Sequence, residues 1–101
     1  MGDTLLEASF VGTVVEWRGP TPFHFVAVPE EWVLPIRVAA REASYGWGVV
    51  PVAAEIAGVS FATSLFPRDG GYLLPLKDKV RRATGLTVGD MARVLMRVER
   101  R

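Results

Sequence analysis

Hydrophobic and polar residues alternate along several short stretches of the chain, a pattern typical of strands with one buried face. These stretches are rich in β-branched and aromatic residues, and segments containing Gly, Pro or Asp separate them. The predicted strands are residues 9–17, 23–28, 48–57, 59–66, 72–75 and 91–99. Many short strands with turn signals between them favour a small barrel or sandwich.

The turn signals and the alternation also predict hairpins and buried faces. Ala57-Gly58 is expected to form a tight hairpin, and residues 67–71 a turn whose glycines accept positive φ. Residues 18–22 contain two prolines and a glycine, which suit a loop. The residues expected to share a face are Val50, Val52, Ala54 and Ile56 in one strand and Val59, Phe61, Thr63 and Leu65 in the next.

Apolar residues at helical spacing predict two short helices. The first has Pro35 in its first turn, where a missing N–H costs nothing, and is expected to end at Gly46. Its predicted buried face is Ile36, Ala39, Ala40 and Ala43. The second covers residues 77–84 and is closed by Gly85. The expected fold is therefore mainly β with two short helices.

Composition is that of one ordinary globular domain, residues 1–101, with 50% hydrophobic and 23% charged residues. The chain has no cysteine, so it can form neither a disulfide nor a thiolate metal site. His24 is its only histidine, so no transition-metal site is expected. No other cofactor is expected either. The start of the chain is acidic, and no apolar run approaches the roughly 20 residues of a membrane span. A cytoplasmic location, with no membrane partner, is expected.

Charge is unevenly distributed along the chain. Residues 1–60 hold three arginines and seven acidic residues, whereas residues 61–101 hold nine Lys or Arg and four acidic residues. Such asymmetry indicates either an anionic partner or an attraction between two halves of one fold.

Several spaced motifs resemble a known family. They are Gly46-Trp47-Gly48 with Val50-Pro51, Thr63 to Pro67, Gly71 to Lys77, Val80-Arg81 and Gly89-Asp90. Together they look like the small bacterial and archaeal family catalogued as domain of unknown function 1905. The resemblance covers nearly the whole chain and implies a double-split β-barrel with pseudo-two-fold symmetry, in which two strand–helix–strand halves interlock. The family carries no established activity.

A weaker likeness links the C-terminal half to the AbrB and MazE regulators, which have swapped-hairpin barrels and bind DNA as dimers. It rests on residues 74–77, 80–81, 85–86 and 89–90. The first half has Glu30-Glu31 where the second half has Leu76-Lys77. Acids at that place would spoil a symmetric basic platform.

A cluster of hydroxyls and cations is the main candidate binding site. Its expected members are Trp47, Thr63, Ser64, Arg68, Lys77 and Arg81. If the predicted strands bring them together, they would hold a small anion or carboxylate. Alternatively, the hydroxyls only cap strand ends and the cations pair with Asp69 or Asp78.

The basic C-terminal half supplies a second hypothesis, nucleic-acid binding. The residues expected to contact phosphates are Lys77, Lys79, Arg81 and Arg82. Lys77 and Arg81 are spaced i, i+4 and would share a helix face. Alternatively, these residues are a solvated face, since the net charge is only +1. The aromatic residues Trp17, Trp32, Tyr45, Trp47 and Tyr72 form either a stacking surface or part of the core.

Catalytic patterns are poorly matched. A Ser64–His24 pair would lack an orienting acid, and the adjacent Glu30 and Glu31 would point apart. No phosphate-binding or dinucleotide motif is present. We therefore expect a non-catalytic module that binds a small anionic ligand or a protein partner, with nucleic-acid binding as the alternative. An exposed apolar patch around Phe66 or Leu73 would favour the protein partner.

Overall fold

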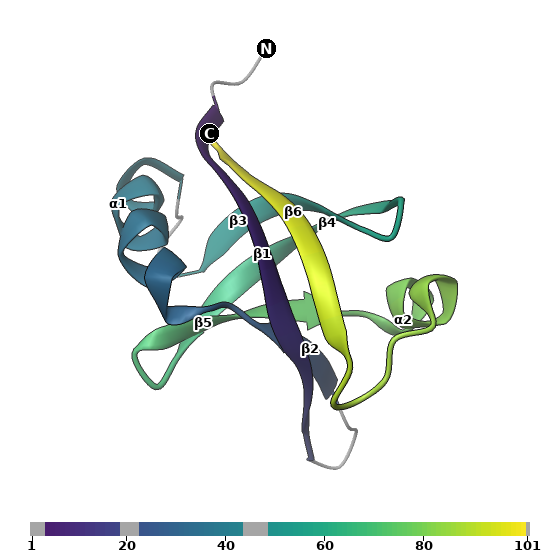
Figure 1. The fold of residues 1–101 in the computed structure, drawn as a ribbon. Helices are drawn as coiled ribbons and strands as arrows, with labels where there is room; N and C mark the ends of the chain where they lie inside the picture. Colours follow the sequence, from purple (N-terminus) through teal and green to yellow (C-terminus); the bar gives the residue numbers. More distant parts are fainter. Residues whose placement is uncertain (1–3, 19–22, 44–48, 101) are drawn as a thin grey trace.

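A computed structural model describes residues 4–18, 23–43 and 49–100 (Figure 1). In this part of the chain, six strands form a closed antiparallel barrel in the order β1-β2-β5-β4-β3-β6. The strands are β1 (Thr4–Trp17), β2 (Phe23–Ala27), β3 (Val50–Ile56), β4 (Val59–Arg68), β5 (Gly71–Leu76) and β6 (Met91–Glu99). The helices are α1 (Val33–Ala43), which follows a 3-10 turn at Glu30–Trp32, and α2 (Asp78–Thr84). The expected mainly β fold with two helices and a barrel is confirmed.

Three strands are longer than the sequence predicts, and β5 gains one residue at each end. β1 begins at Thr4, because residues 4–8 pair with the C-terminal end of β6. β4 continues through Pro67 and Arg68, so the turn that was expected over 67–71 is only Asp69-Gly70. Both turn residues have positive φ, 51° and 79°, as a two-residue hairpin requires. Of the predicted 18–22 loop, only Arg18 is among the described residues. The predicted helix end at Gly46 lies outside them.

The core fills the barrel with one face of every strand. Its largest fully buried side chains are Ile36, Leu65, Leu74, Val14, Val26, Val50, Val94 and Val98. The predicted face of β3 is confirmed, since Val50, Val52, Ala54 and Ile56 are all buried. In α1, Ile36, Ala39 and Ala43 are buried as predicted, whereas Ala40 is only partly buried. Val80 is the residue that α2 buries.

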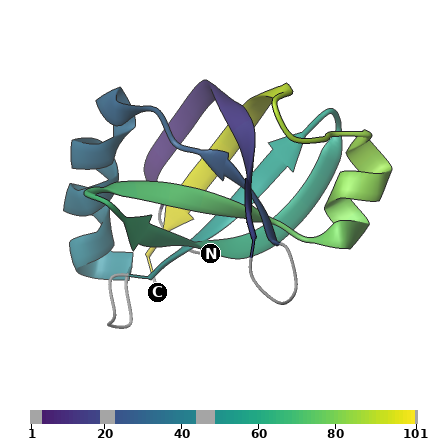
Figure 2. The same cartoon turned by 90° about the horizontal axis from the view of Figure 1, so that it is seen from below.

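The two helices lie on opposite sides of the barrel (Figures 1 and 2). α1 packs against β1, β3 and β6, and α2 packs against β4. The outward side chains of the β1-β6-β3-β4 sheet remain accessible, including those of Glu7, Leu95 and Arg97. We call this surface the open face.

The connectivity has an approximate two-fold relation. The chain runs β1-β2-α1-β3 and then β4-β5-α2-β6. If β1 is exchanged with β4, β2 with β5 and β3 with β6, every pair of neighbouring strands becomes another pair of neighbouring strands. Pro29 and Pro75 mark equivalent points, each shortly before a helix. When the equivalence of Pro29 and Pro75 is carried from strand to strand through the registers, Phe10 becomes equivalent to Thr63 and Val52 to Val94. β3 and β6 are antiparallel neighbours, so their exchange is a rotation about an axis normal to the sheet.

Candidate functional site

The structure does not gather the hydroxyl and cation cluster in one place. Thr63 and Ser64 are successive residues of β4, so their side chains point to opposite faces of the sheet. Thr63 pairs with the buried Val52, whereas Ser64 pairs with Pro51. Trp47 lies outside the described residues.

Arg68 and Lys77 are separated by the length of β5. Arg68 pairs with Gly71 at one end of this strand, and Lys77 follows its other end. Six residues at about 3.3 Å each place them roughly 20 Å apart. Arg68 instead stacks on the ring of Trp17, with 4.1 Å between its Cζ atom and the ring centroid.

Arg81 turns inward toward His24, and so does not extend into solvent beside Lys77. Its Nη1 atom lies 2.9 Å from Nδ1 and 3.2 Å from Nε2 of His24. Nε2 of His24 also lies 3.3 Å from Oε2 of Glu16. A guanidinium only donates, so Nδ1 accepts from Arg81 and Nε2–H donates to Glu16. These contacts link α2 to β1 and β2.

The other cations of the nucleic-acid hypothesis remain on the surface. Lys77, Lys79 and Arg82 are exposed, and within the described part of the chain none of them forms an ion pair. Arg81 contacts Asp78 at 3.8 Å in addition to His24. Three cations, Lys77, Lys79 and Arg82, therefore form no ion pair within the described ranges. The fourth, Arg81, is held by His24 and Asp78.

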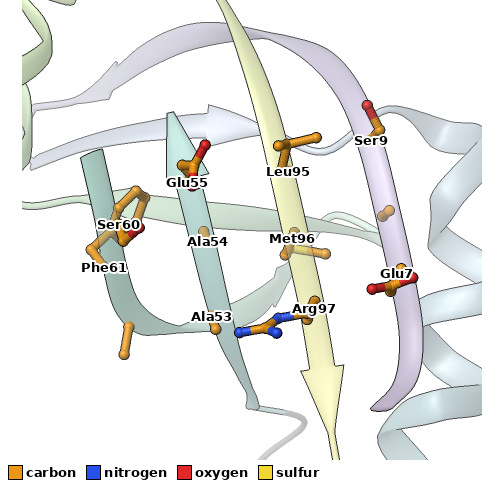
Figure 3. Close-up of a pocket in the computed structure, with 12 residues that line it drawn as sticks. Glu7, Ser9, Ala53, Ala54, Glu55, Ser60, Phe61, Leu95, Met96 and Arg97 are labelled. Carbon is orange, nitrogen blue, oxygen red and sulfur yellow. The ribbon is translucent and has the colours of Figure 1, made fainter. Parts of the chain in front are cut away.

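A groove of about 820 Å³ lies on the open face (Figure 3). The strand registers place its outward residues in two rows across four strands. One row is Glu7, Arg97, Ala53 and Ala62, and the other is Ser9, Leu95, Glu55 and Ser60. Five of these eight residues are Ala, Ser or Leu with no charge, and the small ones leave the sheet surface hollow. Leu95 is 49% exposed, although it lies on a central strand of the sheet.

The groove holds opposite charges that are not satisfied within the described part of the molecule. The Arg97 side chain extends from β6 across Ala53, and the carboxylate of Glu55 lies farther along β3 (Figure 3). Among the described residues, none of Glu7, Glu55 and Arg97 forms an ion pair. These groups are available to a molecule that enters the groove.

The groove is also centred on the approximate two-fold axis. Under the exchange of the two halves, its twelve lining residues map onto one another in six pairs. The pairs are Glu7 with Ser60, Ala8 with Phe61, Ser9 with Ala62, Ala53 with Leu95, Ala54 with Met96, and Glu55 with Arg97. The last pair has opposite charges, so the axis that relates the two halves reverses the charge at this position.

A second hollow, of about 510 Å³, lies outside β1, β2 and β5. Its apolar lining includes Val15, Phe25, Ala27 and Leu73. Phe25 packs edge-on against Phe66, with 5.2 Å between the ring centroids. Phe66 and Leu73 are only partly exposed, so they form no open apolar patch.

The described residues provide no group of three His, Asp or Glu side chains placed for a metal ion. None of the helices in the described ranges is long and apolar enough to cross a membrane.

The sequence matches the family described as domain of unknown function 1905 (DUF1905) over residues 10–96. The chain belongs to this family. The resemblance expected from the motifs is thereby confirmed. No curated protein matches the sequence.

The DUF1905 match reaches from β1 into β6 and includes both helices. Within it lie Glu55, Leu95 and the residues that β4 contributes to the groove, whereas Glu7 and Arg97 lie just outside. Sequence patterns did not single out the groove, because its residues come from four strands and most are small. The sequence indicates the groove only through the alternation of buried and exposed residues in β6, where Leu95 and Arg97 take exposed positions.

Proposed function

We propose that this domain is a protein-interaction module whose open face binds the open face of a second copy of the chain. The supporting observation is the unpaired Glu55 and Arg97, which stand at equivalent positions on either side of the groove's axis. Surface charges of opposite sign without partners among the described residues favour a mixed-charge protein surface as the occupant.

Symmetry makes the face complementary to itself. When two such faces meet, a dyad lying in the interface and perpendicular to the Glu55–Arg97 line brings each Arg97 over the partner's Glu55. The same operation brings each Glu55 over the partner's Arg97, so two ion pairs form. A two-fold dimer uses the same patch on both subunits, as this arrangement requires.

The shape of the face is compatible with this packing. Sheets that pack face to face lie about 10 Å apart and interdigitate their side chains. The small side chains of Ala53 and Ala62 keep the sheet surface low, so the opposing face can approach closely. Burial of the half-exposed Leu95 adds apolar contact at the centre of the interface.

A small anionic ligand, which the sequence also suggested, is less well supported in this groove. Arg97 would hold a carboxylate or phosphate, but Glu7 and Glu55 line the same hollow and repel an anion. A protein surface with both signs of charge satisfies all three residues. The charge balance therefore favours the protein partner.

Sedimentation velocity over a range of concentrations tests the proposal. We expect the wild-type chain to form a dimer, and Arg97→Glu to weaken it by about tenfold or more, because the introduced carboxylate would face the partner's Glu55 across the dyad. Arg37→Glu is the matched control, since Arg37 is exposed on α1 and away from the groove. A wild-type chain that stays monomeric at high protein concentration would contradict the proposal.

We further infer that the barrel is of the double-split, AbrB-like kind. The support is the exchange of β1-β2-α1-β3 with β4-β5-α2-β6, under which each strand keeps its neighbours. A crystal structure in which the two halves do not superpose on one another would contradict this assignment. The cytoplasmic location stays a prediction.

A further inference from the structure

A pair of exposed aromatic residues stands apart from the core. Trp17 of β1 is directly opposite Phe23 of β2, so the two side chains share the outer face. They are 47% and 57% exposed, whereas Phe25 and Tyr72 are at most 7% exposed. Since aromatic side chains are usually buried, packing among the described residues does not account for the exposure of this pair.

A guanidinium already stacks on one member of the pair. Arg68, which reaches Trp17 from β4, lies 4.1 Å from the ring centroid. Its ion pair with Asp69, at 3.6 Å, is solvent-exposed and therefore weak. Trp17, Phe23 and Arg68, here called the aromatic edge, thus form a surface of flat groups with a cation among them.

Lys77, which directly precedes α2, lies beside this edge. Leu76 pairs with His24, the residue after Phe23, and Lys77 follows Leu76 directly. The hydrogen bond between Arg81 and His24 holds α2 at this end of the barrel. The register of β2 with β5 thereby places Lys77 close to Phe23.

Flat rings next to several cations match the chemistry of single-stranded nucleic acid. Bases stack on aromatic side chains whatever their identity, and Lys or Arg side chains contact the phosphates. In a duplex the bases are already stacked on each other, so their faces are not available to Trp17 and Phe23. The described part of the edge has no feature that selects one base, which indicates binding without sequence preference.

We propose that the aromatic edge binds single-stranded DNA or RNA, with bases stacked on Trp17 and Phe23 and phosphates near Arg68 and Lys77. This site is separate from the open face and does not depend on dimer formation. It also revises the nucleic-acid hypothesis from the sequence, since Arg81 now positions α2 and the aromatic residues supply the contact to the bases.

Fluorescence anisotropy of a labelled 15-nucleotide oligo(dT) at low salt is the direct test. Removing one stacking ring typically costs about tenfold in affinity. We expect Trp17→Ala and Phe23→Ala each to weaken binding by about that factor, and Leu34→Ala, an exposed apolar control on α1, to leave it unchanged. Circular dichroism would verify that each variant is folded, and Arg68→Ala provides a further variant that keeps both rings.

Three results would overturn the proposal. The first is an absence of oligo(dT) binding by the wild-type chain even at low salt. The second is binding that survives Trp17→Ala and Phe23→Ala but falls with Lys79→Ala, which would show only charge attraction to α2. The third is equal affinity for the duplex or for free thymidine monophosphate, which would show that no unpaired strand is recognised. Arg97→Glu must leave oligo(dT) binding intact, so failure of the dimer and failure of this site are distinguishable.

Discussion

Nη1 of Arg81 on α2 donates a hydrogen bond to Nδ1 of His24 on β2, over 2.9 Å. These residues are far apart in the sequence, and their contact fixes how α2 lies against the barrel. Because Nε2–H of His24 points to Glu16, the imidazole bridges a carboxylate and a guanidinium. The same contact explains why Arg81 does not extend beside Lys77, although helical spacing alone would place them on one face.

Arg81→Ala should lower stability more than a neighbouring substitution. The change leaves His24 Nδ1 without its donor, and a hydrogen bond to a charged group contributes about 1.5–3 kcal/mol. Arg82→Ala, at an exposed position one residue along, should stay within about 0.5 kcal/mol of wild type. Urea unfolding followed by circular dichroism measures both. Equal losses for the two variants would show that the His24 contact contributes nothing.

Gly12→Ala should be strongly destabilising. β1 leaves its pairing with β6 and begins to pair with β2 just beyond Gly12. A Cβ atom at this position would lie 2.4 Å from the carbonyl oxygen of Ala27 and 2.6 Å from Cγ1 of Val26. Overpacking of this kind typically costs about 1–3 kcal/mol.

Gly71→Ala is the control for that change. The nearest atom to a Cβ at Gly71 is 3.7 Å away, an ordinary contact, and this glycine does not have a positive φ. Thermal unfolding should give a clear loss for Gly12→Ala and a small change for Gly71→Ala. A Gly12→Ala protein as stable as wild type would mean that β1 and β2 are farther apart than described.

Substitutions of Leu95 and Val94 should affect different properties, because successive residues of β6 face opposite sides of the sheet. Val94 is fully buried, so Val94→Ala should cost about 1–3 kcal/mol of unfolding free energy. Leu95→Ser should leave that energy within about 0.5 kcal/mol but weaken dimer formation. Urea unfolding and sedimentation together measure this split. A large stability loss for Leu95→Ser would place this side chain in the core.

Ala57→Asn should raise stability by about 0.5–1 kcal/mol, because it relieves a left-handed backbone position. Ala57 has a φ of 51° in the two-residue hairpin between β3 and β4, a conformation that a Cβ atom disfavours. Asn tolerates it well, and Asn-Gly is the preferred pair in such turns. Thermal unfolding measures the gain. The control Ala62→Asn, on an exposed strand position, should not raise the midpoint.

Local patterns predicted the strands and helices but left barrel and sandwich open; the family resemblance predicted the barrel, and neither predicted the candidate binding surfaces. Alternation identified the buried face of β3, and a glycine correctly marked the end of α2 at Gly85. The hydroxyl and cation cluster was not assembled because one strand separates Arg68 from Lys77, and sequence does not reveal which residues of distant strands are opposite. The groove depends on such registers too: Glu55 and Arg97 become related only when β3 and β6 pair.

The proposed dimer is tested most directly by mixing two charge-reversed variants. Arg97→Glu gives a face with acids at both equivalent positions, and Glu55→Arg gives one with bases at both. Each variant alone should be monomeric in sedimentation velocity, and an equimolar mixture should form a heterodimer, because both ion pairs are then restored across the dyad. A mixture that sediments as monomers, from a wild-type chain that dimerises, would contradict the pairing of Arg97 with Glu55.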